Sequence, residues 1–166
     1  MIKFLVMDVD GTLTDGKVYM GNEGECFKAF DIKDGYAIKC LLPPHHIVPV
    51  IITARNSKIV ENRCKELNIL ECHQNAMNKC EKLVSILSEY SAWDGVKYDF
   101  SNVAYIGDDI LDLQCMTPVK EAGGLVGCPA NAVKQVRAIA DFVSAEKGGE
   151  GAVREFVEWM LEQREK

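Results

Sequence analysis

The chain has 166 residues, of which 48% are hydrophobic, 27% charged and 8% aromatic. This composition is typical of an ordinary globular protein, and the length predicts a single domain over residues 1–166 that folds alone. The formal net charge is -6, the sequence pI is about 5.1, and the lysines and arginines do not cluster. Nucleic acids and anionic membranes both require a basic surface, so the sequence argues against either partner.

The cysteines and the first residues give the expected compartment. The seven cysteines are odd in number, scattered and never spaced as Cys-x-x-Cys, which favours reduced thiols over a disulfide framework or a zinc ribbon. The apolar start at residues 1–7 is too short for a signal peptide, and no apolar run reaches the length of a membrane span. We therefore expect a cytoplasmic protein.

Short apolar runs rich in Val and Ile alternate with helix-length amphipathic stretches. This alternation predicts the α/β class, with a doubly wound parallel sheet covered on both faces. In chain order, the predicted elements are a strand at 2–7, a projecting hairpin at about 16–30, a helix at 36–42, a strand at 50–52, helices at 57–67 and 79–90, a strand at 103–106, a helix at 109–116, a strand at 125–126, a helix at 132–139, a strand at 140–143 and a helix at 152–162. Within the hairpin, extended segments at 17–20 and 25–30 flank Gly21 to Gly24.

Two aspartates follow the first predicted strand, in the stretch Asp8-Val-Asp10-Gly-Thr. Residues two apart on an extended chain point the same way, so the two carboxylates would share one pocket. Ligands of doubly wound sheets bind beyond the carboxyl ends of the strands, which is where these acids stand. An ordinary strand end formed by Asp and Gly explains the same residues, and the pattern alone leaves both interpretations open.

The strand at 50–52 runs into Thr53, and Arg55 follows two residues later. A hydroxyl at this edge can donate to a phosphate oxygen, although the same position also suits a helix cap. The Arg55 guanidinium can bind a carboxylate or phosphate through two N–H groups, or it can be solvated. Lys79 begins the next predicted helix and, taken alone, is typical of a surface lysine.

A second acidic group, Asp108, Asp109 and Asp112, follows the strand at 103–106. Carboxylates in the first turn of a helix interact favourably with its dipole, which is one explanation for them. With Asp8 and Asp10, however, they would concentrate negative charge at one sheet edge, and this is costly unless a cation offsets it. A hard divalent ion with oxygen ligands fits such a site, and Mg²⁺ suits a phosphate substrate.

Taken together, these segments resemble the haloacid dehalogenase superfamily of phosphotransferases. The Asp-x-Asp-Gly-Thr opening at Asp8, the strand-end Thr53, Lys79 and the Gly-Asp-Asp-x-x-Asp signature ending at Asp112 follow the order of that family over nearly the whole chain. The resemblance implies a Rossmann-like sheet and two-step covalent catalysis. Asp8 would attack phosphorus, while Asp10 would protonate the leaving oxygen and then activate water.

The resemblance also implies a magnesium cofactor and a phosphate-binding set. Mg²⁺ would be held by Asp8, by the backbone carbonyl of Asp10 and by Asp108. Thr53 and Lys79 would bind the transferring oxygens. Two further acids would orient the metal-bound waters and the lysine, namely Asp109 and Asp112.

The intervals from Asp10 to Thr53 and from Thr53 to Lys79 are too short for the cap domain that most members insert. The chain resembles the capless 3-deoxy-D-manno-octulosonate 8-phosphate phosphatases, which are similar to the phosphatase domain of some acylneuraminate cytidylyltransferases. The motifs that carry this likeness are Asp15-Gly16, Lys28-x-Phe30, Asp34-Gly35, Arg55-x-Ser57, Arg63 and Gly148-Gly-x-Gly151. Such proteins, whose product serves lipopolysaccharide biosynthesis, are typically homotetramers whose hairpins pair.

By resemblance, Arg55 meets the carboxylate of the sugar acid, and Arg63 is carried over as a second substrate-binding residue. This favours the octulosonate 8-phosphate over nine-carbon keto-sugar-acid 9-phosphates of the KDN and N-acylneuraminate (sialic acid) type, which stay the alternative. Two positions depart from the family pattern. Ala54 stands where glycine is usual, and Lys147 stands where arginine is usual, so Lys147 lacks the two-pronged guanidinium contact.

Two other classes of protein share parts of this pattern. A phospho-accepting signalling receiver also has an acidic pocket, a Thr, a Lys and a reactive Asp on a parallel sheet. It lacks an acid–base group two residues beyond that Asp, so Asp10 favours a phosphatase. An inactive regulatory subunit that keeps the fold is the other alternative. The intact catalytic set argues against it, namely Asp8, Asp10, Lys79 and Asp108.

Overall fold

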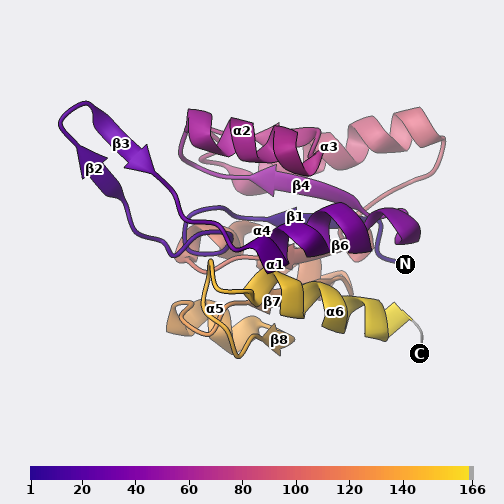
Figure 1. Ribbon diagram of the computed structural model, residues 1–166. Coiled ribbons are helices and arrows are strands. Elements are labelled where there is room, and N and C mark those ends of the chain that lie inside the picture. Colours follow the sequence, from indigo (N-terminus) through magenta and orange to yellow (C-terminus); the bar gives the residue numbers. More distant parts are fainter. Residues whose placement is uncertain (165–166) are drawn as a thin grey trace.

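The computed structural model describes residues 1–164, which are built around a six-stranded sheet of parallel strands (Figure 1). Strand β1 (Phe4–Met7) lies at the centre, between β4 (Val48–Ile52) and β6 (Val103–Ile106). The outer strands are β5 (Glu71–His73) on the β4 side, and β7 (Leu125–Cys128) and β8 (Phe142–Val143) on the β6 side. The predicted α/β doubly wound fold is therefore confirmed.

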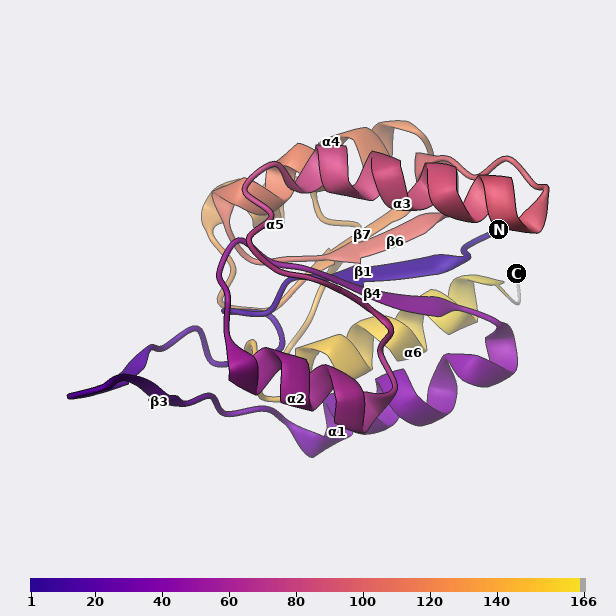
Figure 2. The same ribbon diagram turned by 90° about the horizontal axis from the view of Figure 1, so that it is seen from above.

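Helices cover both faces of the sheet (Figure 2). One face carries α3 (Lys79–Asp94), α4 (Leu113–Glu121) and α5 (Lys134–Ile139), and the other carries α1 (Ile32–Tyr36), α2 (Lys58–Leu67) and α6 (Ala152–Arg164). Because side chains alternate along a strand, Phe4 and Val6 pack toward α3 and α4, while Leu5 and Met7 pack toward α6. All four are fully buried, which explains the unbroken apolar run in the sequence.

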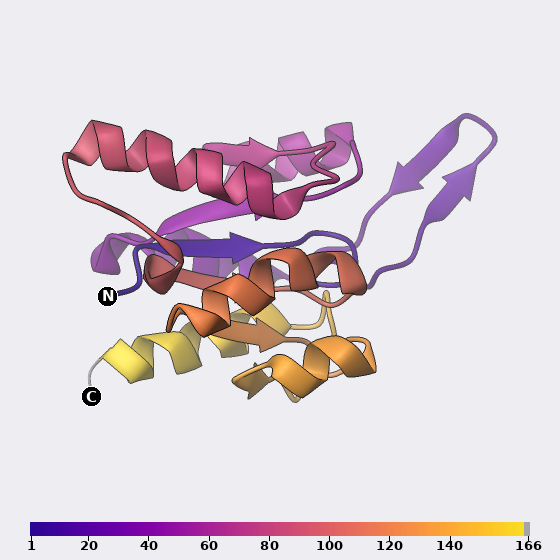
Figure 3. The ribbon, with the colours of Figure 1, turned by 180° about the vertical axis from the view of Figure 1, so that it is seen from behind.

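A hairpin projects from the sheet, on the side away from the two chain ends (Figures 1 and 3). Its strands are β2 (Tyr19–Gly21) and β3 (Gly24–Phe27), which confirms the hairpin predicted within 16–30, with shorter strands than expected. The rings of Tyr19 and Phe27 stack with their centroids 4.3 Å apart. Within residues 1–164, the segment between β1 and β4 holds this hairpin and short helices but no cap domain.

Some predicted helix boundaries are wrong, and local capping explains why. The helix expected at 36–42 begins at Ile32, because the Asp31 side chain accepts a hydrogen bond from the Lys33 N–H (2.6 Å) and caps it. It continues as a π-helical segment, Ala37–Leu41, before Pro43 begins a 3-10 turn. The helix expected at 109–116 splits into a 3-10 turn, Ile110–Asp112, and α4, which runs on to Glu121.

Two differences concern the sheet. Strand β5 has no predicted counterpart, because it is only three residues long, lies at the edge and contains a single apolar residue, Cys72. Strand β4 begins at Val48, two residues before the predicted strand at 50–52, so Pro49 is its second residue. Val48 donates its N–H toward the β1 side, so Pro49 faces the other side, where pairing with β5 begins only at Val50.

Helix α6 closes the α1–α2 side of the sheet with Val153, Phe156 and Met160, which are fully buried. The Phe156 ring lies directly against β7, where a Cβ atom on Gly127 would come within 2.5 Å of it. The helix predicted at 152–162 is thus confirmed and extends to Arg164. None of the described helices is long and apolar enough to span a membrane.

We expect Phe156→Ala to lower the free energy of unfolding by about 3–5 kcal/mol, because it removes a buried ring and leaves a cavity beside β7. Urea unfolding followed by circular dichroism measures this. The matched control is Leu70→Ala, since Leu70 is 91% exposed and its loss should change the free energy by less than about 0.5 kcal/mol. Equal effects of the two substitutions would contradict the role of α6 in the core.

Candidate active site

The candidate site lies where the three central strands end. From β1 the chain first adds β4 and β5 on one side of the sheet and later crosses to β6, β7 and β8 on the other side. Ligands of doubly wound sheets bind at the point where the strand order reverses in this way. Asp8 follows β1 directly, Thr53 follows β4 directly, and Asp108 lies two residues beyond β6. The parallel strands therefore bring these three side chains to one edge.

Three acids gather there: carboxylate oxygens of Asp8, Asp108 and Asp112 all lie within 4.8 Å of one another. Burial, followed by the neighbouring carboxylates, raises the pKa of Asp108 to about 7. Burial and Asp112 likewise raise the pKa of Asp8 to about 6, although Lys79 works in the opposite direction. Such a cluster is costly as three anions and fits a divalent cation with oxygen ligands, as the sequence predicts.

Asp112 is fully buried and uses both carboxylate oxygens as hydrogen-bond acceptors. One oxygen accepts from the Lys79 ammonium (2.7 Å) and from the Tyr105 hydroxyl (2.8 Å). The other accepts from the backbone N–H groups of Asp108 (2.9 Å) and Asp109 (3.1 Å). Asp112 thus fixes the turn that carries Asp108 and holds the lysine. Sequence reasoning missed Tyr105, which looks like an ordinary core residue of β6.

Lys79 is the first residue of α3, and its side chain is only 2% exposed. Its ammonium lies 2.9 Å from one oxygen of Asp8 and 2.7 Å from Asp112. Burial works against the charged form, but the two carboxylates more than offset this and raise the pKa of Lys79 above its ordinary value. A cation is therefore fixed beside the Asp8 carboxylate, which rules out the solvated surface lysine considered from the sequence.

The loop after β1 is held by close backbone packing. Thr12 donates its hydroxyl to Asp108 (3.0 Å). Gly11 has φ +94°, and a Cβ atom there would lie 2.1 Å from a carboxylate oxygen of Asp108, so only glycine fits. From the C-terminal side, Gly149 donates its N–H to the Thr12 carbonyl (3.1 Å), and a Cβ atom on Gly148 would meet the Gly11 carbonyl at 1.9 Å.

A cleft opens above the acids, and it collects most of the residues that the sequence singled out. Its lining consists of Asp8, Asp10, Thr53, Ala54, Arg55, Lys79, Asp109 and Leu111. Asp109 also caps the following turn by accepting from the Ile110 N–H. Arg63 is not part of this lining. It lies over the Phe30 ring, pairs with Glu66 (2.8 Å) and borders a separate small cavity with Asp34, so substrate binding by Arg63 stays a prediction.

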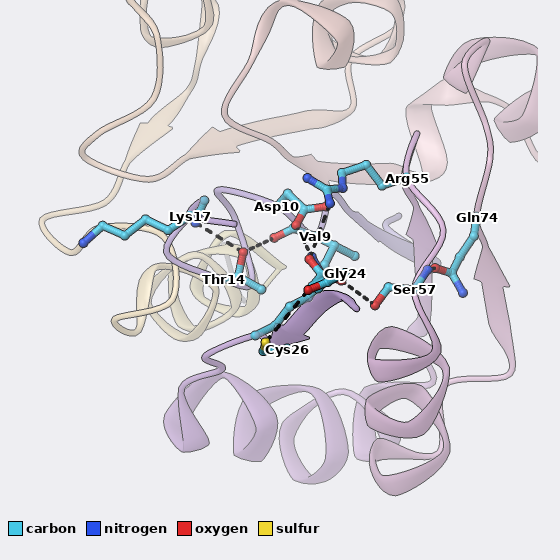
Figure 4. Close-up of polar contacts among 12 residues, drawn as sticks. Val9, Asp10, Thr14, Lys17, Gly24, Cys26, Arg55, Ser57 and Gln74 are labelled. Carbon is cyan, nitrogen blue, oxygen red and sulfur yellow. Dashed lines mark hydrogen bonds and ion pairs between the residues drawn. The ribbon is translucent and has the colours of Figure 1, made fainter. Parts of the chain in front are cut away.

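A polar network connects the cleft to the base of the hairpin (Figure 4). The Lys28 ammonium pairs with Asp10 and with Glu25 (2.8 Å). Glu25 accepts a hydrogen bond from the Ser57 hydroxyl (2.9 Å) and lies 3.5 Å from the Arg55 guanidinium. The sequence pointed to Lys28 only as part of a family motif, because no local pattern shows that the hairpin returns to Asp10.

The chain is 41% identical to the 3-deoxy-D-manno-octulosonate 8-phosphate phosphatase KdsC of Salmonella typhi over 160 residues, which cover 96% of this chain and 79% of the relative. The identity and the coverage are the same for the KdsC protein of Escherichia coli strain K12. The chain belongs to the 3-deoxy-D-manno-octulosonate 8-phosphate phosphatase family. No family model matches it.

Solved structures place this octulosonate phosphatase family within the haloacid dehalogenase superfamily. The Moraxella catarrhalis phosphatase, crystallised with magnesium, phosphate and KDO, is 37% identical, with a TM-score of 0.84 over 97% of this chain and 86% of that chain. The cobalt-bound phosphatase of Haemophilus influenzae is 32% identical, with a TM-score of 0.83 over 99% and 90%. A Legionella pneumophila protein described as a haloacid dehalogenase superfamily hydrolase is 34% identical, with a TM-score of 0.84 over 99% and 85%.

The acid cluster predicts how stability depends on pH without a divalent ion. The pKa values of Asp8 (about 6) and Asp108 (about 7) lie above their ordinary value of 3.8, so between these values the folded protein binds more protons than the unfolded one. Their contribution to stability is therefore fully present below pH 3.8 and is lost as the pH rises through about 6 and 7. Thermal unfolding in chelator across this range measures the loss.

Adding Mg²⁺ should reverse this loss of stability at high pH. We expect Mg²⁺ to raise the melting temperature more at about pH 8 than at about pH 5, because protons compete with the metal for carboxylates. Asp108→Asn should abolish the magnesium-dependent rise. Glu121→Gln, on the exposed end of α4, is the control and should keep it. A rise of the same size in Asp108→Asn would show that Mg²⁺ stabilises the protein elsewhere.

Proposed function

We propose that the chain is a magnesium-dependent phosphatase that hydrolyses 3-deoxy-D-manno-octulosonate 8-phosphate through an aspartyl-phosphate intermediate on Asp8. One observation carries this proposal. The Asp8 carboxylate borders the cleft at the sheet's switch point, with the Lys79 ammonium 2.9 Å away and the Asp108 carboxylate in the same cluster. A nucleophile and a fixed cation in the cleft, with a candidate cation site that shares Asp8, suit phosphoryl transfer, which depends chiefly on positioning and charge stabilisation.

In the first half-reaction, an Asp8 oxygen forms a bond to phosphorus, and the bond from phosphorus to the sugar's terminal oxygen breaks. Asp10, which borders the same cleft, gives its proton to that oxygen so that it leaves as an alcohol. In the second half-reaction, water attacks the phosphorus of phospho-Asp8. Asp10 takes the proton of that water, inorganic phosphate departs, and Asp8 is restored as a carboxylate.

The remaining cleft residues stabilise the transferring group. Lys79, whose ammonium lies 2.9 Å from Asp8, and Thr53 both line the cleft, and they would bind the non-bridging oxygens. Asp8, Asp108 and the backbone carbonyl of Asp10 would hold Mg²⁺, which when bound supplies charge neutralisation for the phosphate. Asp112 keeps Lys79 in place, and Asp109 would orient waters of the metal.

Substrate choice depends on Arg55 in this proposal. Its side chain lines the cleft and is 45% exposed, so its guanidinium, which lies 3.5 Å from Glu25, has N–H groups that can also bind a carboxylate of the sugar acid. The Moraxella catarrhalis relative was crystallised with KDO, which supports the eight-carbon acid. The nine-carbon 9-phosphates of the KDN and N-acylneuraminate type are the alternative substrates, since they present the same carboxylate.

We infer further that the chain acts as a homotetramer in the cytoplasm. A two-stranded hairpin is marginally stable in water by itself, and this one exposes Val18, Met20 and Phe27. Pairing of hairpins between copies would bury these side chains. All seven cysteines are free thiols, which supports a reducing compartment.

A magnesium-dependent screen of phosphorylated sugar acids tests the proposed activity. We expect phosphate release from 3-deoxy-D-manno-octulosonate 8-phosphate with a higher kcat/KM than from the nine-carbon 9-phosphates, and none in the presence of a chelator. Asp8→Asn should be inactive, because an amide oxygen does not replace the carboxylate as a nucleophile. Near-native activity of Asp8→Asn would rule out the covalent mechanism, and a stable phospho-Asp8 without turnover would instead indicate a signalling receiver.

Arg55→Ala tests the contact with the sugar carboxylate. We expect KM for the sugar-acid phosphate to rise about 10- to 100-fold, the cost of a charge-assisted hydrogen bond, with little change for p-nitrophenyl phosphate, which has no carboxylate. Lys58→Ala is the control, because Lys58 is an exposed cation on the neighbouring helix α2. Equal changes for both substrates in Arg55→Ala would remove Arg55 from substrate selection.

A further inference from the structure

The carboxylate of Asp10 has one side-chain partner among residues 1–164, the ammonium of Lys28. Lys28 follows β3 at the base of the hairpin, 18 residues along the chain from Asp10. The Lys28 side chain is only 1% exposed, whereas that of Asp10 is 20% exposed and borders the cleft. A buried lysine at the base of the hairpin therefore binds the acid–base candidate Asp10 without lining the cleft itself.

Lys28 is itself held from behind. Glu25, three residues earlier in β3, pairs with its ammonium at 2.8 Å. The Glu25 carboxylate in turn accepts from the hydroxyl of Ser57, the residue that precedes α2 (2.9 Å). Figure 4 shows Asp10 and Ser57 beside the hairpin residues Gly24 and Cys26. The ammonium is thus fixed between two carboxylates, one of which is anchored to the body of the protein.

Stabilisation of the hairpin does not by itself explain why a lysine is buried between Asp10 and Glu25. A buried ammonium is costly to desolvate, and well-packed apolar residues in its place are often as stable or more so. The hairpin already has an apolar contact of its own, the stacked rings of Tyr19 and Phe27. What an apolar residue cannot do is bind the Asp10 carboxylate and fix its direction.

We propose that Lys28 is a positioning residue that holds the Asp10 side chain in the orientation needed for proton transfer to the leaving group. This inference rests on the proposed phosphatase activity and adds to it a role for the hairpin within its own chain. Lys28 is not among the residues that line the cleft, so in this proposal it contacts neither phosphorus nor the leaving oxygen. It acts through Asp10, so its loss slows the step that needs an acid and spares a step that does not.

Phenyl phosphate and p-nitrophenyl phosphate separate these steps. The two esters are similar in shape and lack a carboxylate, but phenolate is a poor leaving group that needs a proton, whereas p-nitrophenolate departs without one. The ratio kcat/KM reports the first irreversible step, the transfer to Asp8, and excludes the later attack by water. General acid catalysis typically contributes about 10²–10⁴-fold, so in Lys28→Met we expect kcat/KM to fall about 10- to 100-fold for phenyl phosphate and less than about threefold for p-nitrophenyl phosphate.

Lys17→Met is the matched control, because Lys17 is an exposed lysine on the other arm of the hairpin, and it should leave both ratios unchanged. Lys28→Arg keeps the cation and should recover part of the phenyl phosphate activity. Lys28→Met should fold, since Asp10 and Glu25 are both partly exposed and can be hydrated, and Lys28→Gln serves if it does not.

Equal losses for the two esters in Lys28→Met would overturn the positioning role and leave Lys28 a structural residue. So would a rise in KM alone, which would indicate that Lys28 binds the substrate directly. If the unaltered protein hydrolysed neither these esters nor 3-deoxy-D-manno-octulosonate 8-phosphate in the presence of Mg²⁺, the proposed function itself would fail. The control measurement therefore separates failure of the function from failure of the inference.

Discussion

The site depends on one ammonium group shared by two carboxylates. Lys79 lies 2.9 Å from Asp8 and 2.7 Å from Asp112, with almost no exposure to water. Without it, Asp8, Asp108 and Asp112 would be three adjacent acids in a poorly solvated place, and protonation rather than ionisation would be favoured. Lys79 thus keeps Asp8 more acidic than burial alone allows, while Asp112 restrains the lysine. A nucleophilic carboxylate at neutral pH follows from this sharing.

The loop that follows Asp8 also makes close contacts with two other segments of the chain. Asp108 lies so near Gly11 that no side chain fits there, and Gly148 lies just as near the Gly11 carbonyl from the C-terminal segment. Helix α6, which follows that segment, is packed on the sheet through Phe156. The loop that carries the catalytic aspartates is therefore clamped between two parts of the chain that are far apart in sequence. Packing of α6 and the geometry of the site are linked through this contact.

The residues that could be predicted from the sequence are those placed by local rules. Asp8, Thr53 and Asp108 stand at the ends of apolar runs, and parallel pairing alone brings such ends together. The helix start at Ile32 and the strand at 71–73 were missed, because a cap and an edge pairing decide them rather than periodicity. The contact between Lys28 and Asp10 was also missed, because it depends on the path of the hairpin, which no residue pattern encodes.

The absence of a cap within residues 1–164 leaves Asp10 partly open to water, with 20% of its side chain exposed, against 11% for Asp8. An acid–base side chain in that position can adopt several rotamers, and each unproductive one lowers the rate of proton transfer. A cap domain that encloses the site would restrict these rotamers. In this chain the hairpin restricts them instead, through the ion pair between Lys28 and Asp10. The two ends of the hairpin are thus suited to different roles. The tip, where Met20 is exposed, is suited to contact with other molecules, and the base, where Lys28 is buried, is suited to fixing Asp10.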